Sequence, residues 1–196
     1  MTAPLLDDTL KNRLAAAYGD GARHYHTLGH VHALLALATQ HRALLSDVEA
    51  VEAAIWFHDA VYDSRAKDNE ARSAARERLA GRADAARIER IAAMIEATAT
   101  HQVPPLADAA ALRDASLFLD MDLSILGAAP DAFDAYEQAV RREYGWVDEA
   151  AWRTGRATVL RHFLDQRHVF HTGEFRERYE RQARQNMARS LEALTR

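Results

Sequence analysis

Apolar residues recur at spacings of three and four along most of the chain, which is the period of an amphipathic α-helix. The clearest stripe comprises His30, Leu34, Leu37, His41 and Leu44. The alternation of apolar and polar residues that is typical of strands is missing. The pattern therefore predicts an all-α fold. The expected helices cover residues 5–18, 27 or 28 to 45, a stretch carrying 55–61, a segment opened by residue 68 or 69, and then 84–101, 108–127, 130–146, 148–166 and 173–195.

Turn and cap residues separate these predicted helices. Gly19-Asp20-Gly21 should end the first helix, because glycine tolerates the left-handed conformation that stops one. Ser46-Asp47 is typical of an N-cap for the helix that follows. Residues 102–106 contain two consecutive prolines and should form a break. No repeat or linker-like stretch divides the chain, so we expect a single domain over residues 1–196, a helical bundle with a sizeable core.

Composition narrows the class of protein further. Glycine (8) and proline (4) are scarce, which also favours helices. The net charge of −4 gives no electrostatic case for binding a nucleic acid duplex. The chain has no cysteine, so disulfides, thiolate metal sites and thiol nucleophiles are excluded. We find no leader peptide and no apolar run long enough for a membrane span, so we expect a cytoplasmic protein. The amphipathic C-terminal helix permits a homodimer without requiring one.

Two titratable residues interrupt the apolar run IWFHDAVYD, residues 55–63. Burying His58 and Asp59 there costs several kcal/mol unless a partner compensates them. In a helix, His58 would have mostly apolar neighbours three and four residues away. The pair could be a histidine bonded to an aspartate within the core. A metal ion would account for both groups at once.

The segment RHYHTLGHVHALL, residues 23–35, concentrates histidine. Five of the ten histidines of the chain lie between residues 24 and 41. His26 and His30 are four residues apart and would share a face if both were helical. His30 also heads the apolar stripe, where a histidine is commonly just a core residue.

The third unusual segment is ASLFLDMDLSILG, residues 115–127. Asp120 and Asp122 are about 200° apart on a helical wheel, so they cannot both face one site. The turn neighbours of Asp122 are all apolar, whereas those of Asp120 are mixed. We therefore expect Asp122 to be the buried carboxylate, in need of a cation, and Asp120 to reach solvent or to orient a neighbour.

These segments together give two imidazoles and two carboxylates: His30, His58, Asp59 and Asp122. Such a set suits a divalent ion such as Mn, Fe, Co, Ni, Zn or Mg and disfavours Ca. Four protein ligands on an octahedral ion leave two positions open, which is the layout of a catalytic metal site.

The order H…HD…D on helices resembles the HD-domain superfamily of metal-dependent phosphohydrolases. RHYHTLGHV, WFHDAVYD, DNEARSA and LDMDLSILG resemble the signatures of its small bacterial subgroup, and YEQAVRREYGWV (136–147) and HTGEF (171–175) extend the likeness over most of the chain. YHTLGH is also similar to a stretch of cyclic-nucleotide phosphodiesterases, which implies His30 as a metal ligand and His26 as a general acid. That comparison also supports Asp122 over Asp120 as the last ligand. Thr27 stands where that branch has Asn.

The resemblance implies hydrolysis of a small phosphorylated substrate, for which nucleotides, cyclic nucleotides and other phosphoesters all remain open. A metal-bound water would attack phosphorus, and His26 would protonate the leaving oxygen. Asp59 would bind the metal and hold the water. Glu70, one turn into the next helix, could orient a water or simply stabilise the helix N-terminus. His101 could bind phosphate or a second ion, or cap its helix.

A cation should face the anionic substrate. Arg141, Arg23 and Lys67 are the candidates, and Arg141 is preferred because it lies in YEQAVRREY.

Two alternative functions remain open. Some HD-fold proteins hold two irons and oxidise C–H bonds, but they need further histidines, and here only His101 lies between Asp59 and Asp122. A degenerate HD domain that binds a nucleotide as a sensor or scaffold is the other alternative, because a fold does not establish turnover.

Overall fold

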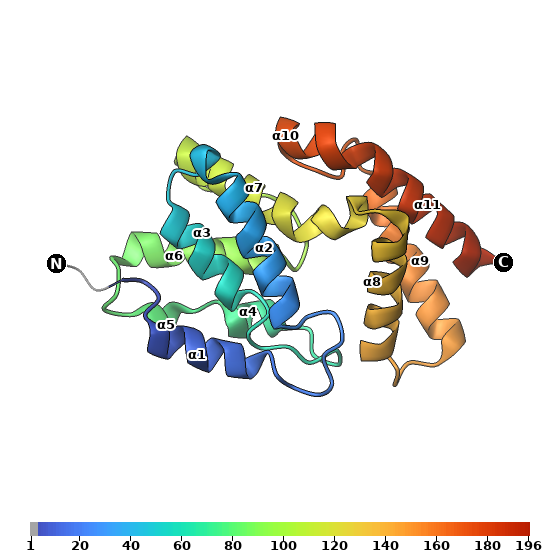
Figure 1. The fold of residues 1–196 in the computed structure, drawn as a ribbon, viewed down its shortest axis with the longest axis horizontal. Coiled ribbons are helices and arrows are strands. Elements are labelled where there is room, and N and C mark those ends of the chain that lie inside the picture. Colours follow the sequence, from blue (N-terminus) through green and yellow to red (C-terminus); the bar gives the residue numbers. More distant parts are fainter. Residues whose placement is uncertain (1–3) are drawn as a thin grey trace. The chain divides into compact units, whose positions relative to one another are not determined.

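The computed structural model describes residues 4–196 as helices joined by turns (Figure 1). Within this range there is no β-strand, only an isolated bridge between Ala80 and Ala83. The all-α prediction is confirmed, and the assignment to the HD-domain type stays a prediction. The prediction of no leader peptide concerns the N-terminal segment, and residues 1–3 of that segment lie outside the described part of the chain.

The chain divides into two compact units, with the boundary between Met121 and Asp122. The first unit holds the helices α1 (Asp8–Ala17), α2 (Leu28–Gln40), α3 (Val48–Phe57), α4 (Asn69–Ser73), α5 (Arg76–Leu79), α6 (Ala85–Ala97) and most of α7 (Ala109–Leu123). The second holds α8 (Pro130–Glu143), α9 (Glu149–Asp165), α10 (Gly173–Phe175), a π-helical turn (Arg176–Glu180) and α11 (Arg181–Thr195). Short 3₁₀ turns at Arg42–Leu44 and Ser124–Gly127 follow α2 and α7. The single domain expected over residues 1–196 stays a prediction.

Aspartates define where several helices begin. The side chain of Asp47 accepts a hydrogen bond from the Ala50 amide at 3.1 Å, so the predicted N-cap of α3 is confirmed. Asp84 caps α6 and Asp148 caps α9 in the same way, and α8 begins with Pro130 at its first position. Each cap satisfies an amide that would otherwise lack a partner inside the helix.

Helix α3 is the central element of the first unit. It packs against α2 and α6 and also contacts α1. Its residues from Val51 onward are almost all buried, and the exposed fraction of Val51, Ile55 and Phe57 is 0%. Burying each such side chain contributes about 1.5–3 kcal/mol. The rigid core around α3 is what fixes the residues at its C-terminal end.

We expected this helix to carry residues 55–61, and the prediction was wrong at the C-terminal end. Helix α3 stops at Phe57, with His58 as its C-cap, and Asp59 lies in the turn beyond. Neighbouring residues inside a helix point about 100° apart. Because the chain leaves the helix at His58, the two adjacent side chains are free to turn toward one point.

The second unit contains a polar network around the buried side chain of Arg156, which we call the Arg156 cluster: Tyr136, Glu137, Arg156 and Ser190. The guanidinium of Arg156 donates to Glu137 Oε1 at 3.0 Å and to the Tyr136 hydroxyl at 3.0 Å. Ser190 donates to the other Glu137 oxygen at 2.8 Å. Burial raises the pKa of Tyr136, so its phenol stays neutral. The cluster links α8, α9 and α11.

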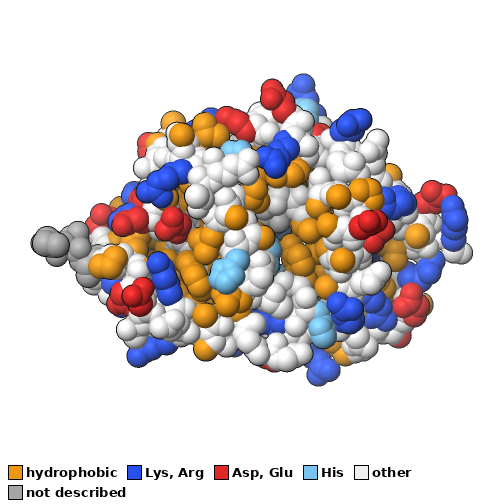
Figure 2. All heavy atoms as spheres, viewed as in Figure 1, with side chains coloured by type: hydrophobic (Ala, Val, Ile, Leu, Met, Phe, Trp, Pro, Cys, Tyr) orange, Lys and Arg blue, Asp and Glu red, His pale blue; other side chains and the backbone are white. Residues whose placement is uncertain are grey.

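On the face drawn in Figure 2, acidic, basic and apolar side chains lie next to one another. The expectation that no nucleic acid duplex binds rests on the net charge of −4 and stays a prediction. Among the helices of residues 4–196, none has the length and apolarity needed to cross a membrane.

Candidate metal centre

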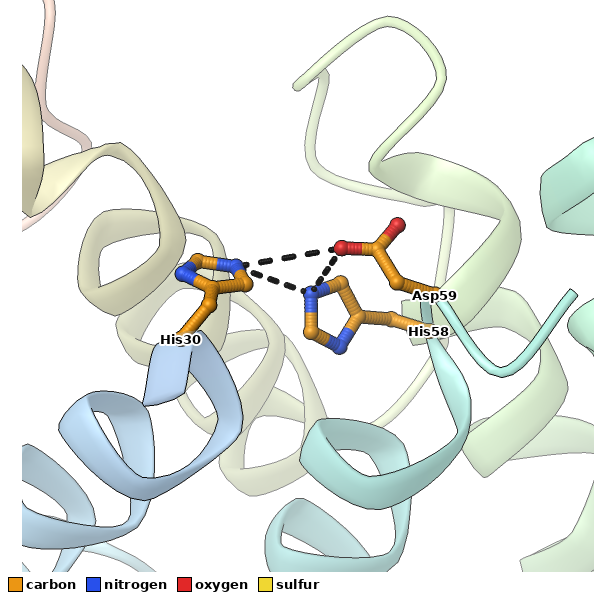
Figure 3. A group of neighbouring side chains, drawn as sticks. All are labelled: His30, His58 and Asp59. Carbon is orange, nitrogen blue, oxygen red and sulfur yellow. Dashed lines mark hydrogen bonds and ion pairs between the residues drawn. The ribbon is translucent and has the colours of Figure 1, made fainter. Parts of the chain in front are cut away.

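Three of the predicted ligands meet at the end of α3. His30 projects from α2, His58 from the C-cap of α3 and Asp59 from the following turn, and their polar ends converge (Figure 3). The Nε2 atoms of His30 and His58 lie 3.1 Å apart. Asp59 Oδ2 lies 2.9 Å from the His58 nitrogen and 3.8 Å from that of His30. We call this group the His–His–Asp cluster.

The orientation of His58 is set by its other ring nitrogen. Nδ1 lies 2.9 Å from the carbonyl oxygen of Ile55, which can only accept, so Nδ1 donates the proton. Without a metal ion, a protonated ring donates from Nε2 to Asp59; when that proton leaves, the ring keeps its Nδ1 bond and presents a lone pair at Nε2, toward the cluster. Metal-binding histidines are commonly held by such a bond from the second nitrogen. His58 exposes only 1% of its surface, so the ring cannot swing out to water.

The carboxyl group of Asp59 is held in its ionised form. Burial by itself would raise its pKa, but the charges of His58 and His26, the hydrogen bond from His58 and the charge of His30 together hold the pKa well below its usual range. An ionised carboxylate is the form that binds a metal. The carboxylate is thus ready for a cation, whereas the imidazole protons that lower its pKa would leave when a metal ion binds.

The spacing of the three donor atoms fits a single ion. All three lie within 4.8 Å of one another. Ligand atoms at about 2.0–2.2 Å from an ion lie about 3 Å apart when they are cis on an octahedron, and further apart at wider angles. The three measured separations of 2.9, 3.1 and 3.8 Å cover this range. Two imidazoles and a carboxylate suit Mn, Fe, Co, Ni or Zn. This group could therefore hold a metal ion.

Side chains from other segments satisfy the carbonyls at the end of α3. The Tyr18 hydroxyl donates to Trp56 O at 3.0 Å. Arg23 donates to Asp59 O at 2.7 Å and to Ala60 O at 3.3 Å. The last carbonyls of a helix lack partners within it, so these bonds complete the C-terminal end of α3. They also hold the Asp59 backbone in place.

Helix α4 fixes the chain just beyond the cluster. The Ser73 hydroxyl accepts from Val61 N at 3.1 Å and donates to Val61 O at 3.2 Å. One turn earlier, Asn69 accepts from Asp63 N at 3.1 Å and donates to Asp63 O at 2.9 Å. Two side chains of a helix thus pair with alternate residues of an extended segment, as a neighbouring strand would. Asn69 and Ser73 of the DNEARSA segment thus hold the chain that follows the cluster.

His26 lies beside the cluster and outside any helix. Helix α2 begins at Leu28, as expected, so His26 is not helical and the condition for a helical face shared with His30 is not met. The two rings are nevertheless neighbours, with centroids 6.2 Å apart. The His26 ring stacks on Tyr62, 4.3 Å between centroids, and its charge lowers the pKa of Asp59. Its role as a general acid stays a prediction.

Glu70 and His101 occupy helix ends. Glu70 is half-buried in the first turn of α4. His101 follows α6 with a positive φ of 52°, and its amide donates to Ala97 O at 2.7 Å, which closes the helix. The backbone of His101 therefore has the capping role that we considered, while catalytic roles for both side chains stay predictions.

The predicted burial of the two aspartates on α7 was wrong. Asp120 exposes 0% of its surface, whereas Asp122 is half-buried. A helical wheel shows only the neighbours within one helix, and burial depends on what packs against each face. Asp122 belongs to the second unit, and its role as a fourth ligand stays a prediction.

Two of the three candidate cations are engaged in main-chain contacts. Arg141 donates to Tyr144 O at 2.8 Å and to Val147 O at 3.2 Å, which holds the turn after α8. Arg23 is buried and donates to carbonyls near the cluster. Lys67 is exposed in the loop before α4. Substrate binding by Arg141 stays a prediction.

Sequence reasoning did not identify Tyr62, Asn69 and Ser73 as supports of the site. Asn69 and Ser73 are small polar residues four apart, a spacing that places them on one helix face and could have suggested a shared partner.

Comparison of the chain with protein-family models, with curated proteins and with solved structures finds no match.

Proposed function

We propose that the chain is a metal-dependent phosphohydrolase that acts on a small phosphorylated compound, with nucleotides among the candidates. The observation that carries the proposal is the convergence of His30 Nε2, His58 Nε2 and Asp59 Oδ2 at spacings that suit one divalent ion. Three protein ligands leave coordination positions open, which is typical of catalytic rather than structural sites. The resemblance of the sequence segments to HD-domain phosphohydrolases supplies the reaction class.

His30, His58 and Asp59 would hold the ion. When bound, a divalent ion supplies Lewis acidity, which makes a bound water more acidic and polarises a phosphoryl oxygen. The hydrogen bond from His58 to Ile55 O keeps that imidazole in the binding tautomer. Asp59 contributes a negative charge, and its exposed edge, 15% of the side chain, is open to a water.

His26 would donate the proton to the leaving oxygen. An imidazole with an ordinary pKa of about 6.5 can give up a proton near neutral pH. The ring stacks on Tyr62 and lies one ring away from His30, so it is held next to the cluster. Replacing His26 with Gln should lower turnover and leave metal binding intact.

The experiment that tests the proposal is reconstitution of the metal-free protein with Mn, Co, Ni or Mg, followed by a panel of phosphoester substrates. We expect hydrolysis that depends on the added metal and is lost in His30→Ala. His32→Ala is the matched control, because His32 lies on the same helix, two residues away, and is exposed. Asp122→Ala in the same panel tests the predicted fourth ligand. Hydrolysis by His30→Ala at the wild-type rate would refute the proposal.

A second candidate function has a specific observation in its favour. Two histidines and one carboxylate with open positions are also the ligand set of mononuclear non-haem iron oxygenases. The His–His–Asp cluster has this composition. Iron analysis of the purified protein and oxygen uptake on addition of Fe(II) separate the two functions. Oxygen consumption without phosphoester hydrolysis would favour the oxygenase.

A further inference from the structure

Arg23 is a buried cation that contacts two of the segments which form the candidate site. It exposes 8% of its surface. Its Nη1 donates to His26 O at 3.0 Å and to Asp59 O at 2.7 Å, and its Nη2 donates to Ala60 O at 3.3 Å. One guanidinium therefore joins the loop before α2 to the turn after α3. These two segments carry the predicted proton donor and a predicted metal ligand.

Aromatic rings enclose the same guanidinium. Its central carbon lies 5.0 Å from the centroid of the Tyr18 ring and 5.4 Å from that of Tyr62. Both rings are themselves held, because Tyr18 donates to Trp56 O and Tyr62 stacks on His26. Contact with aromatic faces stabilises a buried guanidinium that, within residues 4–196, donates only to carbonyl oxygens.

This geometry argues against Arg23 as a phosphate ligand. Three of the five N–H groups donate to carbonyl oxygens, two from Nη1 and one from Nη2, and Nε is buried without a hydrogen-bond partner among the described residues. Because Arg23 is only 8% exposed, moving its guanidinium outward to meet a phosphate would break these bonds and leave the carbonyls unsatisfied, which is costly in a buried place. Arg23 also lies at the C-terminal end of α3, where a positive charge is favourable because the last carbonyls carry partial negative charge.

We infer that Arg23 is a positioning residue, which sets where the Asp59 carboxylate and the His26 ring stand by clamping their backbones together. The expected consequence, that the clamp keeps the His–His–Asp cluster in a geometry that binds a metal ion, rests on the proposed function. The planar fork is needed, because three carbonyls in different directions must be reached from two nitrogens of fixed geometry.

The test uses the full chain with Arg23→Met and Arg23→Lys. Hydrogen exchange of the metal-free protein reports the clamp directly, at the amides of Ala60, bonded to Phe57 O, and Val61, bonded to Ser73. We expect exchange at these amides to accelerate by about 10- to 100-fold in both variants, the effect of losing hydrogen bonds from a charged donor. Calorimetric titration with Co(II) should show affinity reduced by about 10- to 100-fold.

Arg184 provides a matched control. It clamps three main-chain carbonyls in the second unit, those of Leu164 at 3.0 Å, Gln166 at 2.8 Å and Arg167 at 3.0 Å. Arg184→Met removes the same kind of main-chain clamp, together with an ion pair to Glu180, from a unit that holds none of the three cluster residues. It should leave exchange at Ala60 and Val61, and Co(II) affinity, as in the wild type.

Unchanged exchange at Ala60 and Val61 in Arg23→Met would overturn the inference. So would equal loss of Co(II) affinity in Arg184→Met, which would indicate general destabilisation, or full affinity in Arg23→Lys, which would show that charge and not the fork matters. A wild-type protein that binds no Co(II) would instead refute the proposed function. The exchange measurement needs no metal, and it would still decide whether Arg23 holds the two segments.

Discussion

The two units each bury a polar cluster, and the clusters differ in where their positive charge comes from. In the Arg156 cluster the guanidinium bonds directly to the Glu137 carboxylate, and hydroxyls of Tyr136 and Ser190 complete the network. In the His–His–Asp cluster, two imidazole nitrogens and a carboxylate oxygen point at each other. The nearby guanidinium of Arg23 donates to backbone carbonyls and not to this carboxylate.

The difference shows how a structural polar network can be told from a binding site. A structural network contains both signs of charge in direct contact, so it is complete as the chain folds. In the His–His–Asp cluster, a proton on one imidazole can serve the contact with Asp59, but one divalent cation would serve all three donor atoms at once. The following predictions separate the two clusters, in decreasing order of expected effect on the free energy of unfolding.

The largest effect should come from breaking the Arg156 cluster. Arg156→Met leaves the Glu137 carboxylate without its cation in a place where the arginine is only 9% exposed, and removing one partner of such a pair costs about 3–5 kcal/mol. Urea unfolding measures this loss. Arg156→Met/Glu137→Leu should recover most of it, because neither charge remains. Co(II) affinity of the folded variant should be unchanged, and a parallel loss of affinity would contradict the separation of the clusters.

Metal binding should stabilise the protein through the other cluster. At a free metal concentration of about 100 times the dissociation constant, the free energy of unfolding should rise by about 2.7 kcal/mol. Asp59→Asn keeps the size of the side chain and removes its charge, so at the same metal concentration it should gain much less. Thermal or urea unfolding with and without a chelator measures both values. Equal stabilisation of the variant would place the metal elsewhere.

Removing the hydroxyl of Ser73 should have a smaller effect. Ser73→Ala leaves the amide and carbonyl of Val61 without their partner, at a cost of about 1–3 kcal/mol, and it should also weaken Co(II) binding by loosening the turn after Asp59. Ser116→Ala is the control, because that hydroxyl donates to Leu112 O within its own helix. A Ser73→Ala protein with wild-type Co(II) affinity would limit the support from α4 to stability.

The smallest effect is expected at the opposite end of α3. Burial opposes ionisation of Asp47, but hydrogen bonds from Arg87 and from the Ala50 amide prevail and lower its pKa from the ordinary value of 3.8. The ionised carboxylate therefore stabilises the fold above the unfolded-state pKa, and this contribution is lost as the pH falls through the lower folded-state pKa.

Asp47→Asn should cost less than about 1 kcal/mol near neutral pH, because the pair is partly exposed. Its unfolding free energy should fall less steeply than that of the wild type as the pH falls below the ordinary pKa of 3.8 and through the lower folded-state pKa. Urea midpoints across this range measure the difference, and Co(II) affinity at neutral pH should not change. A steeper acid limb in the variant would contradict the assigned direction of the pKa shift.

Much of the fold could be predicted because its signals are local. The N-cap at Asp47, the break at 102–106 and the start of α2 at Leu28 follow from caps, prolines and apolar spacing. His30, His58 and Asp59 could be found because polar groups in apolar runs require compensation. These features depend on residues within one or two helical turns.

The parts that could not be predicted depend on distant segments. Asp120 is fully buried despite mixed neighbours on its own helix, because packing from elsewhere covers it. Arg23 could be named as a cation, but its use depends on carbonyls more than thirty residues away, at Asp59 and Ala60. The early end of α3 likewise depends on side chains from other segments, among them Tyr18, that satisfy its last carbonyls.

The end of α3 at Phe57 has a consequence for how this dipeptide could be moved or redesigned. His58 still has helical backbone angles, Asp59 lies in the turn beyond, and their polar ends meet there. In a helix extended through Asp59, the two side chains would point about 100° apart. The dipeptide could therefore be grafted onto another scaffold only together with a helix terminus and the side chains that complete it.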